Sequence, residues 1–371
     1  MHAEASVENE PPANDLAAWL RLQHLPGVGP VAARALLARF GLPGQIFAAS
    51  FDALREVVST SLARTITEPP RRVANSQLEL TLQWLQRPGN AVLTLADAAY
   101  PPLLLEIADP PLLLYVRGRA ELLSRPGIAI IGSRNASAQG MQNAAAFAES
   151  LSRAGLTIIS GLALGIDTQA HEGGLRGPGS TVAVIGTGAD LVYPKRNLDL
   201  AQRIAEQGCV VSEYALGLPA MPANFPRRNR LISGLARGVL VIEAAALSGS
   251  LITARLAGEQ GRDVYALPGS IHSTLAKGCH ALIKQGAKLV ESVEDVLQEL
   301  QWQGAFPALA AGSASEPVDE VLAALGHDPH GADTLAERSG LAVGAVMGQL
   351  LALEMAGLVE RLPGGLFQRC K

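Results

Sequence analysis

The stretch FPRRNRLISGLARGVLVIEAAALSGSLIT, residues 225–253, carries the pattern that decides the fold. Its apolar run Val239–Ile242 has the length and composition of a buried parallel strand, and Ser248-Gly249-Ser250 then opens a helical segment. A strand that leads through a small-residue turn into a helix presents backbone N–H groups and the helix dipole to an anion. The stretch therefore predicts an α/β layer with an anion site at a strand end.

Charge sharpens this prediction. The window Tyr214–Ile242 contains no Asp or Glu, although the chain has a formal net charge of −4. It contains four arginines: Arg227, Arg228, Arg230 and Arg237. The alternative is a set of solvated surface arginines beside a tight turn, and the length of the acid-free window favours the anion site.

Outward from this stretch, strand-length apolar runs alternate with helix-like segments from residue 127 to residue 300. The runs are Ile128–Ile131, Thr157–Ile159, Thr181–Ile185, Cys209–Val211, Val239–Ile242 and Val264–Leu267. Uniformly apolar runs interleaved with helices predict a parallel, doubly wound α/β sheet, in which ligands bind at the carboxyl ends of the strands. The side chains expected to converge there are Arg134, Lys195, Arg228 and Arg230, with the hydroxyls of Ser133, Ser160 and Ser248.

The same turns lack the common catalytic and cofactor motifs. The first turn is GSRNAS rather than GxGxxG, and GxxxxGK[ST], HExxH and GxSxG do not occur. Asp167 and His171 could share a helix face, but such a pair is more often structural than catalytic. The pattern predicts a phosphate-binding site without catalytic groups. The protein is therefore not expected to be an enzyme or to use a cofactor.

Composition limits the class of protein. A chain of 371 residues with 48% hydrophobic residues predicts two or three domains with real cores. Cys209, Cys279 and Cys370 form no CxxC pair, so neither a disulfide framework nor a metal site is predicted. The N-terminus has no targeting pattern and no apolar run is long enough for a membrane span, so a cytoplasmic location is expected.

The N-terminal region, residues 1–75, predicts a helical domain of the SAM-like or helix-hairpin-helix type. Its Gly27-Val28-Gly29 turn would bare backbone amides to a phosphate, and a hairpin used only for packing is an equal alternative. Residues 76–300 are predicted to form the core and residues 301–316 a linker.

Residues 317–371 predict three helices followed by a hairpin, the winged-helix order. From Val318 to Ala356 there are six acids and one arginine, and the helix in the recognition position carries only Glu354. Such a surface would repel DNA phosphates, which favours a protein-contact or structural role.

The chain resembles the DNA-processing protein A (DprA, also called Smf) family of bacteria. The resemblance rests on IAIIGSRNAS, IISGLALGIDTQAH, GTGADLVYPKRN, VSEYALG, the stretch from Phe225 that continues to PGS, and KGCHALIKQGAKLV. It implies an extended Rossmann-like core that binds single-stranded DNA, forms a homodimer, protects incoming strands and loads the RecA recombinase on them during natural transformation.

The resemblance also implies particular residues. It places Ser133, Arg134, Lys195, Phe225, Arg228, Asn229 and Arg230 in the strand-binding pocket. The strand-end turns add Gly161, Ser248 and Ser250 to the predicted DNA-binding set, and the predicted dimer set is Leu275, His280, Leu282 and Ile283. A cationic strand-end pocket suits a flexible single strand better than a stiff duplex, and a base could stack on Phe225. The alternative is a nucleotide-binding enzyme similar to phosphoribohydrolases of the same α/β class, with Glu243 as its carboxylate.

Overall fold

In a computed structural model, which describes residues 13–69, 72–304, 320–326 and 328–369, the chain forms two compact units. Unit 1 is built from the segments up to residue 125 and from 182 to 236, and unit 2 from residues 126–181 and 237 onward. Neither unit is a continuous piece of sequence. The parts of the expected N-terminal domain and linker at residues 1–12, 70–71 and 305–316 lie outside the described residues.

Unit 1 begins with short helices, as the sequence predicts. They are α1 (Ala13–Gln23), α2 (Pro30–Phe40), α3 (Pro43–Ala48), α4 (Phe51–Arg55), α5 (Thr60–Thr67) and α6 (Arg72–Leu85). Proline opens α2 and α3, and the side chains of Ser50 and Ser59 cap α4 and α5. A separate small core, formed by Leu22, Leu36, Ile46, Leu54, Ala63 and Ile66, holds α1 to α5 together.

The rest of unit 1 is a mixed sheet in the strand order β1-β2-β6-β5. Its strands are β1 (Asn90–Thr94), β2 (Leu113–Gly118), β5 (Thr181–Val184) and β6 (Cys209–Ser212), with β1/β2 and β2/β6 antiparallel and β5/β6 parallel. Its helices are α7 (Pro102–Leu105), η1 (Ala120–Ser124), η2 (Lys195–Asn197), α10 (Leu198–Gln207) and α11 (Asn224–Leu235). The proline-rich segment at Pro102 looks from its sequence like an edge strand, but it is helical, because proline is well suited to the first turn of a helix.

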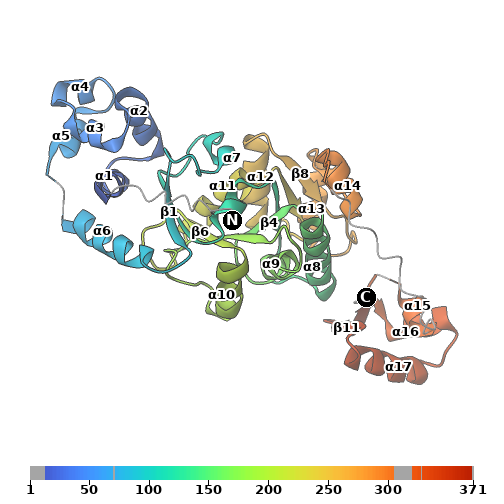
Figure 1. Cartoon of the computed structure of the whole chain (residues 1–371). Helices are drawn as coiled ribbons and strands as arrows, with labels where there is room; N and C mark the ends of the chain where they lie inside the picture. Colours follow the sequence, from blue (N-terminus) through green and yellow to red (C-terminus); the bar gives the residue numbers. More distant parts are fainter. Residues whose placement is uncertain (1–12, 70–71, 305–319, 327, 370–371) are drawn as a thin grey trace. The chain divides into compact units, whose positions relative to one another are not determined.

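Unit 2 is a parallel α/β layer in the strand order β4-β3-β7-β8-β9. The strands are β3 (Gly127–Ile131), β4 (Thr157–Ser160), β7 (Gly238–Val241), β8 (Asp263–Ala266) and β9 (Lys288–Leu289). The helices are α8 (Ala138–Arg153), α9 (Ile166–Gly174), α12 (Ser250–Glu259), α13 (Lys277–Lys284) and α14 (Val293–Glu299). Figure 1 shows α8 and α9 side by side, with α12 across the strands from them. This confirms the doubly wound α/β class.

One core joins the strands of unit 2 to α8, α9 and α14. Alternate strand residues, such as Ile128 and Ile130, point into it, as the two-residue period of a strand requires. Trp302 packs against the same core, and its indole N–H donates to the Ala154 carbonyl at 3.0 Å. The packed core therefore extends at least two residues into the segment that the sequence assigns to the linker.

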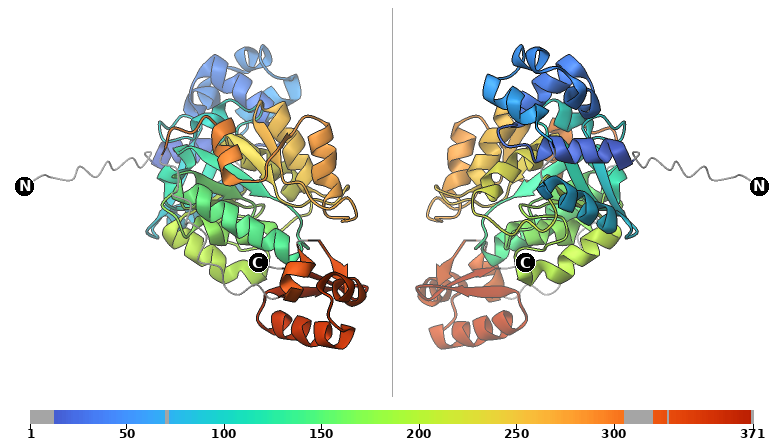
Figure 2. Two further views of the ribbon diagram at one scale, coloured as in Figure 1. Left: turned by 90° about the vertical axis from the view of Figure 1, so that its right-hand side faces the viewer. Right: turned by 90° about the vertical axis from the view of Figure 1, so that its left-hand side faces the viewer.

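Residues 320–369 form a separate winged-helix domain. Its elements are α15 (Glu320–Leu325), β10 (His330–Gly331), α16 (Ala332–Ser339), α17 (Val343–Met355), β11 (Val359–Leu362) and β12 (Leu366–Arg369), with the strand order β10-β12-β11. Figure 2 shows the hairpin of β11 and β12 beside α17. The hairpin tip turns through Gly364 and Gly365, both at positive φ (87° and 76°), which glycine adopts without strain.

Within the described residues, none of the helices combines the length and the apolar character needed to span a bilayer.

Candidate nucleic-acid interface

In unit 1 the carboxyl end of β5 meets the start of α11. Asn224, the first residue of α11, donates from its side-chain amide to the Gly186 carbonyl at 3.1 Å, and the Tyr214 hydroxyl donates to the Asn224 carbonyl at 3.1 Å. Burial, and then the charge of Glu213, raise the pKa of Tyr214 to about 12, so this hydroxyl stays a donor. The start of α11 is thereby fixed beside the turn that follows β5.

An aromatic pair lies on this turn. The ring of Phe225 packs over Gly186, where an added Cβ would be 3.0 Å from the ring, so a larger residue would require the ring to move. The ring of Tyr193 lies beside that of Phe225, with centroids 5.4 Å apart and planes at 40°. Phe225 is half-buried, whereas Tyr193 is 51% exposed.

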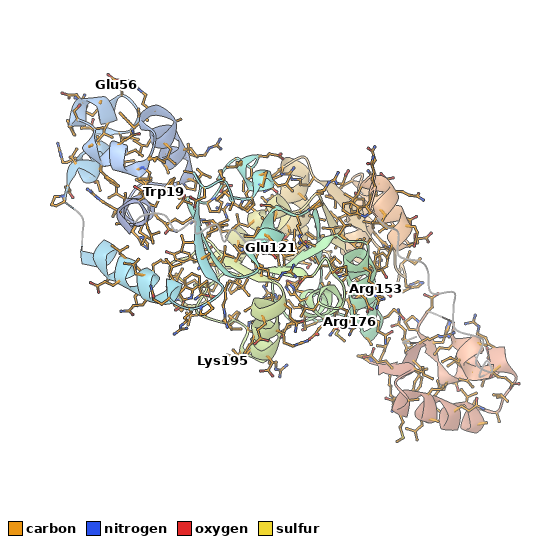
Figure 3. The ribbon with its side chains drawn as sticks, viewed as in Figure 1. Trp19, Glu56, Glu121, Arg153, Arg176 and Lys195 are labelled. Atoms are coloured by element: carbon orange, nitrogen blue, oxygen red, sulfur yellow. The ribbon has the colours of Figure 1, made fainter. Side chains whose placement is uncertain are left out.

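Lys195 lies close to this pair along the chain. It opens η2 two residues after Tyr193, and it is exposed (Figure 3). Of the predicted residues, Phe225 contacts the ring of Tyr193, and Lys195 follows that tyrosine by two positions. Tyr193 is not in the predicted set, although an aromatic residue two positions before a predicted phosphate contact was a signal for it.

The arginines of α11 are placed differently from the expectation. Arg228 and Arg230 are buried, at 4% and 5% exposure, rather than lining an open surface. The Arg228 guanidinium donates to the Val184 carbonyl, and its Nε donates to the side-chain oxygen of Asn229 at 3.3 Å. The bond to Val184 therefore helps to hold α11 on β5, whereas the bond to Asn229 lies within α11.

Arg230 is an ion-pair partner in the interior of unit 1. Its two terminal nitrogens each donate to a carboxylate oxygen of Glu213 at 2.7 Å, and its Nε donates to Asp109 at 2.7 Å. Burial opposes the charged form, but the hydrogen bonds and charge of Glu213, together with Asp109, raise the pKa of Arg230. Glu213 directly precedes the acid-free window, so the window gave no sign of this partner.

In unit 2 the turn after β3 is tied down through its backbone. Ser133 donates its N–H to the Glu243 carbonyl at 2.8 Å and accepts from the Ile166 N–H at 3.2 Å. Gly165 lies at φ 75°, and a Cβ there would be 2.4 Å from the Ser133 carbonyl oxygen. The backbone of this turn is fixed, while the side chain of Arg134 is exposed.

Glu243, the carboxylate of the enzyme alternative, is engaged by α8. Its oxygens accept from the Ser137 hydroxyl at 2.6 Å and the Ser137 N–H at 2.9 Å. The Ser137 hydroxyl oxygen in turn accepts from the Gly140 N–H at 3.0 Å and caps α8. An added Cβ at Gly140 would lie 2.3 Å from the Glu243 carboxyl carbon, so the carboxylate and the helix start fit closely.

The turn after β4 is held by Asp167 and His171 of α9. Asp167 accepts from the N–H groups of Gly161 and Ala163 at 3.1 and 3.3 Å, and His171 Nε2 accepts from the Leu162 N–H at 3.2 Å. Since Nε2 is an acceptor, the ring proton is on Nδ1, which donates to the Thr181 hydroxyl at 2.7 Å. Asp167 and His171 thus have the structural role that the sequence favoured.

The remaining hydroxyls of this region also have partners. The buried Ser160 hydroxyl donates to the Ile130 carbonyl at 2.7 Å. The Ser248 and Ser250 hydroxyls are 2.5 Å apart, and the Ser250 N–H donates to Ser248 Oγ at 3.3 Å at the start of α12. The expected small-residue turn is present, with its hydroxyls bonded to each other.

The predicted dimer residues flank and occupy α13. Leu282 is 9% exposed and faces the interior with Cys279, so it is not available as a surface contact in this chain. Ile283 and Leu275 are half-buried, and His280 Nε2 donates to the Gly269 carbonyl at 2.9 Å. The large exposed apolar side chain of this region is instead Ile271, at 68%.

Among the residues that the structure describes, no group of three or more His, Cys, Asp and Glu side chains is arranged to hold a metal ion.

Comparison with known proteins identifies relatives over most of the chain. Residues 91–301 match the family model for DNA recombination-mediator protein A, and residues 306–365 match the DprA winged helix domain. The chain is 43% identical to Protein Smf of Escherichia coli over 298 residues, which is 78% of this chain and 80% of that protein. It is 49% identical to DNA processing protein DprA of Streptococcus pneumoniae over 209 residues, which is 56% of this chain and 74% of that protein.

Two solved structures are similar to the fold. The X-ray structure of DprA from Streptococcus pneumoniae superposes with a TM-score of 0.67 at 36% identity, covering 78% of this chain and 98% of that chain. The second comes from work on the single-stranded DNA binding mode of DNA processing protein A from Helicobacter pylori. It has a TM-score of 0.53 at 30% identity and covers 58% of this chain and 97% of that chain.

Proposed function

The chain belongs to the DNA recombination-mediator protein A (DprA) family, and we propose that it binds single-stranded DNA without altering it chemically. The observation that carries the proposal is the surface of Tyr193, Phe225 and Lys195 at the end of β5. Aromatic rings stack on the unpaired bases of a single strand, and a nearby cation binds its phosphates. The homologue from Helicobacter pylori, whose single-stranded DNA binding mode has been described, supports the same ligand class.

The exposed cations supply the first test. Lys195→Ala and Arg134→Ala should each weaken binding to oligo-dT and flatten the slope of log affinity against log salt by about 0.7. Fluorescence anisotropy titrations at several salt concentrations measure both quantities. Arg176→Ala is the matched control, because Arg176 is an exposed arginine that pairs with Glu149 and is outside the predicted DNA-binding set. If both variants keep the wild-type affinity and slope, these cations are not phosphate contacts.

The buried arginines enter the proposal in a different role. We infer that Arg228 and Arg230 hold α11 in place, with Asn229 beside them, and that they act on DNA affinity through Phe225. Loss of Arg228 should therefore lower affinity with little change in salt slope, whereas a direct phosphate contact would flatten it. The same titration on Arg228→Met separates the two roles.

Against the enzyme alternative stands the Glu243 carboxylate, whose oxygens both accept hydrogen bonds from Ser137. Incubation with nucleoside monophosphates tests the point. Free base released with repeated turnover would favour a phosphoribohydrolase, whereas binding of oligo-dT without turnover favours the DNA-binding role.

We further propose that the winged-helix domain is not needed for single-strand affinity. Helix α17 carries only Glu354 among charged residues, and Val343, Met347, Leu351 and Met355 are exposed along it. Such a face cannot neutralise phosphates. Deletion of residues 317–371 should leave oligo-dT affinity within a few fold. Loss of binding by a truncated protein that keeps the wild-type thermal transition of its core would contradict this.

A homodimer through the α13 region is also proposed, on the family resemblance. Because Leu282 faces inward, the informative variants are Ile271→Glu and Ile283→Glu, with Leu198→Glu, at an exposed position at the start of α10, as the control. Light scattering should give a dimer mass for the wild type and a monomer mass for the double variant. If the double variant kept the dimer mass, the interface would lie elsewhere on the chain.

The role in natural transformation, protection of the strand and loading of RecA, is proposed from the same resemblance. RecA filament growth on an oligonucleotide coated with single-strand-binding protein tests it. The wild type should shorten the lag before growth, and a variant that does not bind DNA should not. An equal lag with and without the wild-type protein would argue against loading.

A further inference from the structure

We propose that Tyr193 is the outer ring of a base-stacking platform, with Phe225 beneath it, and that a nucleobase of the bound strand rests on the tyrosine. The inference rests on the proposed DNA-binding function and deepens it by naming the base contact.

The first support is the exposure of an aromatic ring on an aromatic support. Tyr193 is 51% exposed, and an isolated exposed ring would need no explanation. This ring, however, lies 5.4 Å from Phe225, which itself packs on Gly186. Because the two rings are tilted by 40°, much of the Tyr193 ring stays exposed to solvent, where an unpaired base can reach it.

The second support is that the segment holding Tyr193 is rigid before any ligand arrives. The Thr187 hydroxyl donates to the Leu191 carbonyl at 3.0 Å, and the Asn197 N–H donates to the Pro194 carbonyl at 3.0 Å. Asp190 also accepts the Gly217 N–H at 2.9 Å. Both sides of Tyr193 are therefore fixed, so that binding a base there orders little new structure.

The third support is the charge next to the ring. Lys195 and Arg196 follow Tyr193 closely and both are exposed. A strand whose base lies on the tyrosine carries its phosphate within reach of such flexible cations. The combination of a ring for the base and a cation for the phosphate is the recurring design of sequence-tolerant single-strand sites. We expect little discrimination among bases by hydrogen bonding at this position.

Tyr193→Ala should lower oligo-dT affinity roughly ten- to hundredfold with an unchanged salt slope, because stacking releases no counterions. Tyr193→Phe should retain wild-type affinity within about twofold, since the ring face is kept. Leu198→Ala, which alters another exposed apolar side chain of the same segment, is the control and should have no effect.

A base-deletion scan makes the test specific. A single abasic nucleotide is moved along an oligo-dT of fixed length, and affinity is measured for wild type and Tyr193→Ala. At one position the abasic site should weaken the wild type and leave Tyr193→Ala unchanged, because the base and the ring contribute only together. If the affinity ratio of the two proteins is the same at every position, Tyr193 does not stack on a base.

The outcomes separate this inference from the proposed function. A wild type that does not bind oligo-dT would overturn the function itself. A Tyr193→Ala variant that binds oligo-dT as tightly as the wild type would overturn only the stacking platform. Should Tyr193→Ala not fold, judged by its thermal transition, wild type and Tyr193→Phe decide the matter with 2-aminopurine scanned along the strand: quenching confined to one position in both supports the platform, and its absence overturns it.

Discussion

The strand ends of the two units differ in how their side chains are used: some are bonded within the fold, and others remain exposed. In unit 2, the Glu243 carboxylate is bonded to Ser137, and Asp167 and His171 accept backbone N–H groups. In unit 1, Glu213 holds Arg230 in the interior, while Tyr193 and Lys195 remain exposed. Because buried polar groups need partners, many polar residues at a strand end are used by the fold itself. A ligand contact is better sought among exposed side chains on a rigid support.

The largest expected effect concerns the buried ion pair of Arg230 and Glu213 in unit 1. Arg230→Met leaves the Glu213 carboxylate buried without its main partner, and breaking a buried pair in this way costs about 3–5 kcal/mol of unfolding free energy. Urea denaturation measures the loss. Adding Glu213→Leu to Arg230→Met should recover part of it, since the uncompensated charge is then gone.

Arg227→Met is the matched control, because Arg227 is an exposed neighbour on the same helix. It should change stability by less than about 0.5 kcal/mol. If Arg230→Met were as stable as the wild type and instead flattened the salt dependence of DNA binding, Arg230 would be a phosphate contact.

A second prediction concerns the closed network of unit 2. Gly140→Ala places a methyl group 2.3 Å from the Glu243 carboxyl carbon, so the carboxylate must shift and its bonds to Ser137 are strained. We expect a loss of about 1–3 kcal/mol, the range found for overpacked sites, although alanine ordinarily favours a helix over glycine. Thermal and urea unfolding measure it.

Gly258→Ala in α12 is the control for the sign of this effect, since a Cβ there meets no atom within 4 Å. It should stabilise the protein by up to about 1 kcal/mol. Equal effects of the two substitutions would mean that the contact between Gly140 and Glu243 is not tight.

The smallest effect belongs to an exposed ion cluster of unit 2. Glu149 lies between Arg153 and Arg176, with N–O distances of 2.6 and 3.1 Å, and Figure 3 labels both arginines. Hydrogen bonds from Arg176, and also from Arg153, hold the pKa of Glu149 below its usual value. Glu149→Gln should cost less than about 1 kcal/mol at neutral pH, as expected for surface pairs.

The pH dependence of this cost follows from the lowered pKa. A carboxylate whose pKa is depressed on folding contributes its stability above the unfolded pKa and loses it as the pH falls through the folded pKa. The difference between Glu149→Gln and the wild type should therefore shrink toward zero on acidification. A difference that grows in acid would contradict the assignment.

Much of the fold could be predicted from local sequence. The six apolar runs end within one residue of β3, β4, β5, β6, β7 and β8, and the winged helix follows the predicted order. Strands and helices of this kind are specified by periodicity and by turn residues, which are local properties. The two-residue strand β9 was missed because it is too short to carry a pattern.

Partners at long sequence separation could not be predicted. The acid-free window implied an exposed cationic site, yet Asp109 pairs with Arg230 across 121 residues. Leu282 likewise lies on the inward face of α13, which only the packing against the sheet determines. Motifs predicted Phe225 and Lys195 as DNA contacts, whereas Tyr193 entered the proposed site only through the ring contact that the fold creates.

The discontinuous make-up of the units affects how the chain can fold during synthesis. The antiparallel register pairs Gly118 of β2 with Cys209 of β6, so one edge of β2 has no strand to pair with until the ribosome has made all of β3 to α10 and β6 itself. Unpaired strand edges recruit other chains, and non-local pairings form slowly. A nascent chain that stalls near residue 181 would expose this edge with unit 1 unfinished, and it is at this stage of synthesis that a chaperone would have most effect on the yield of folded protein.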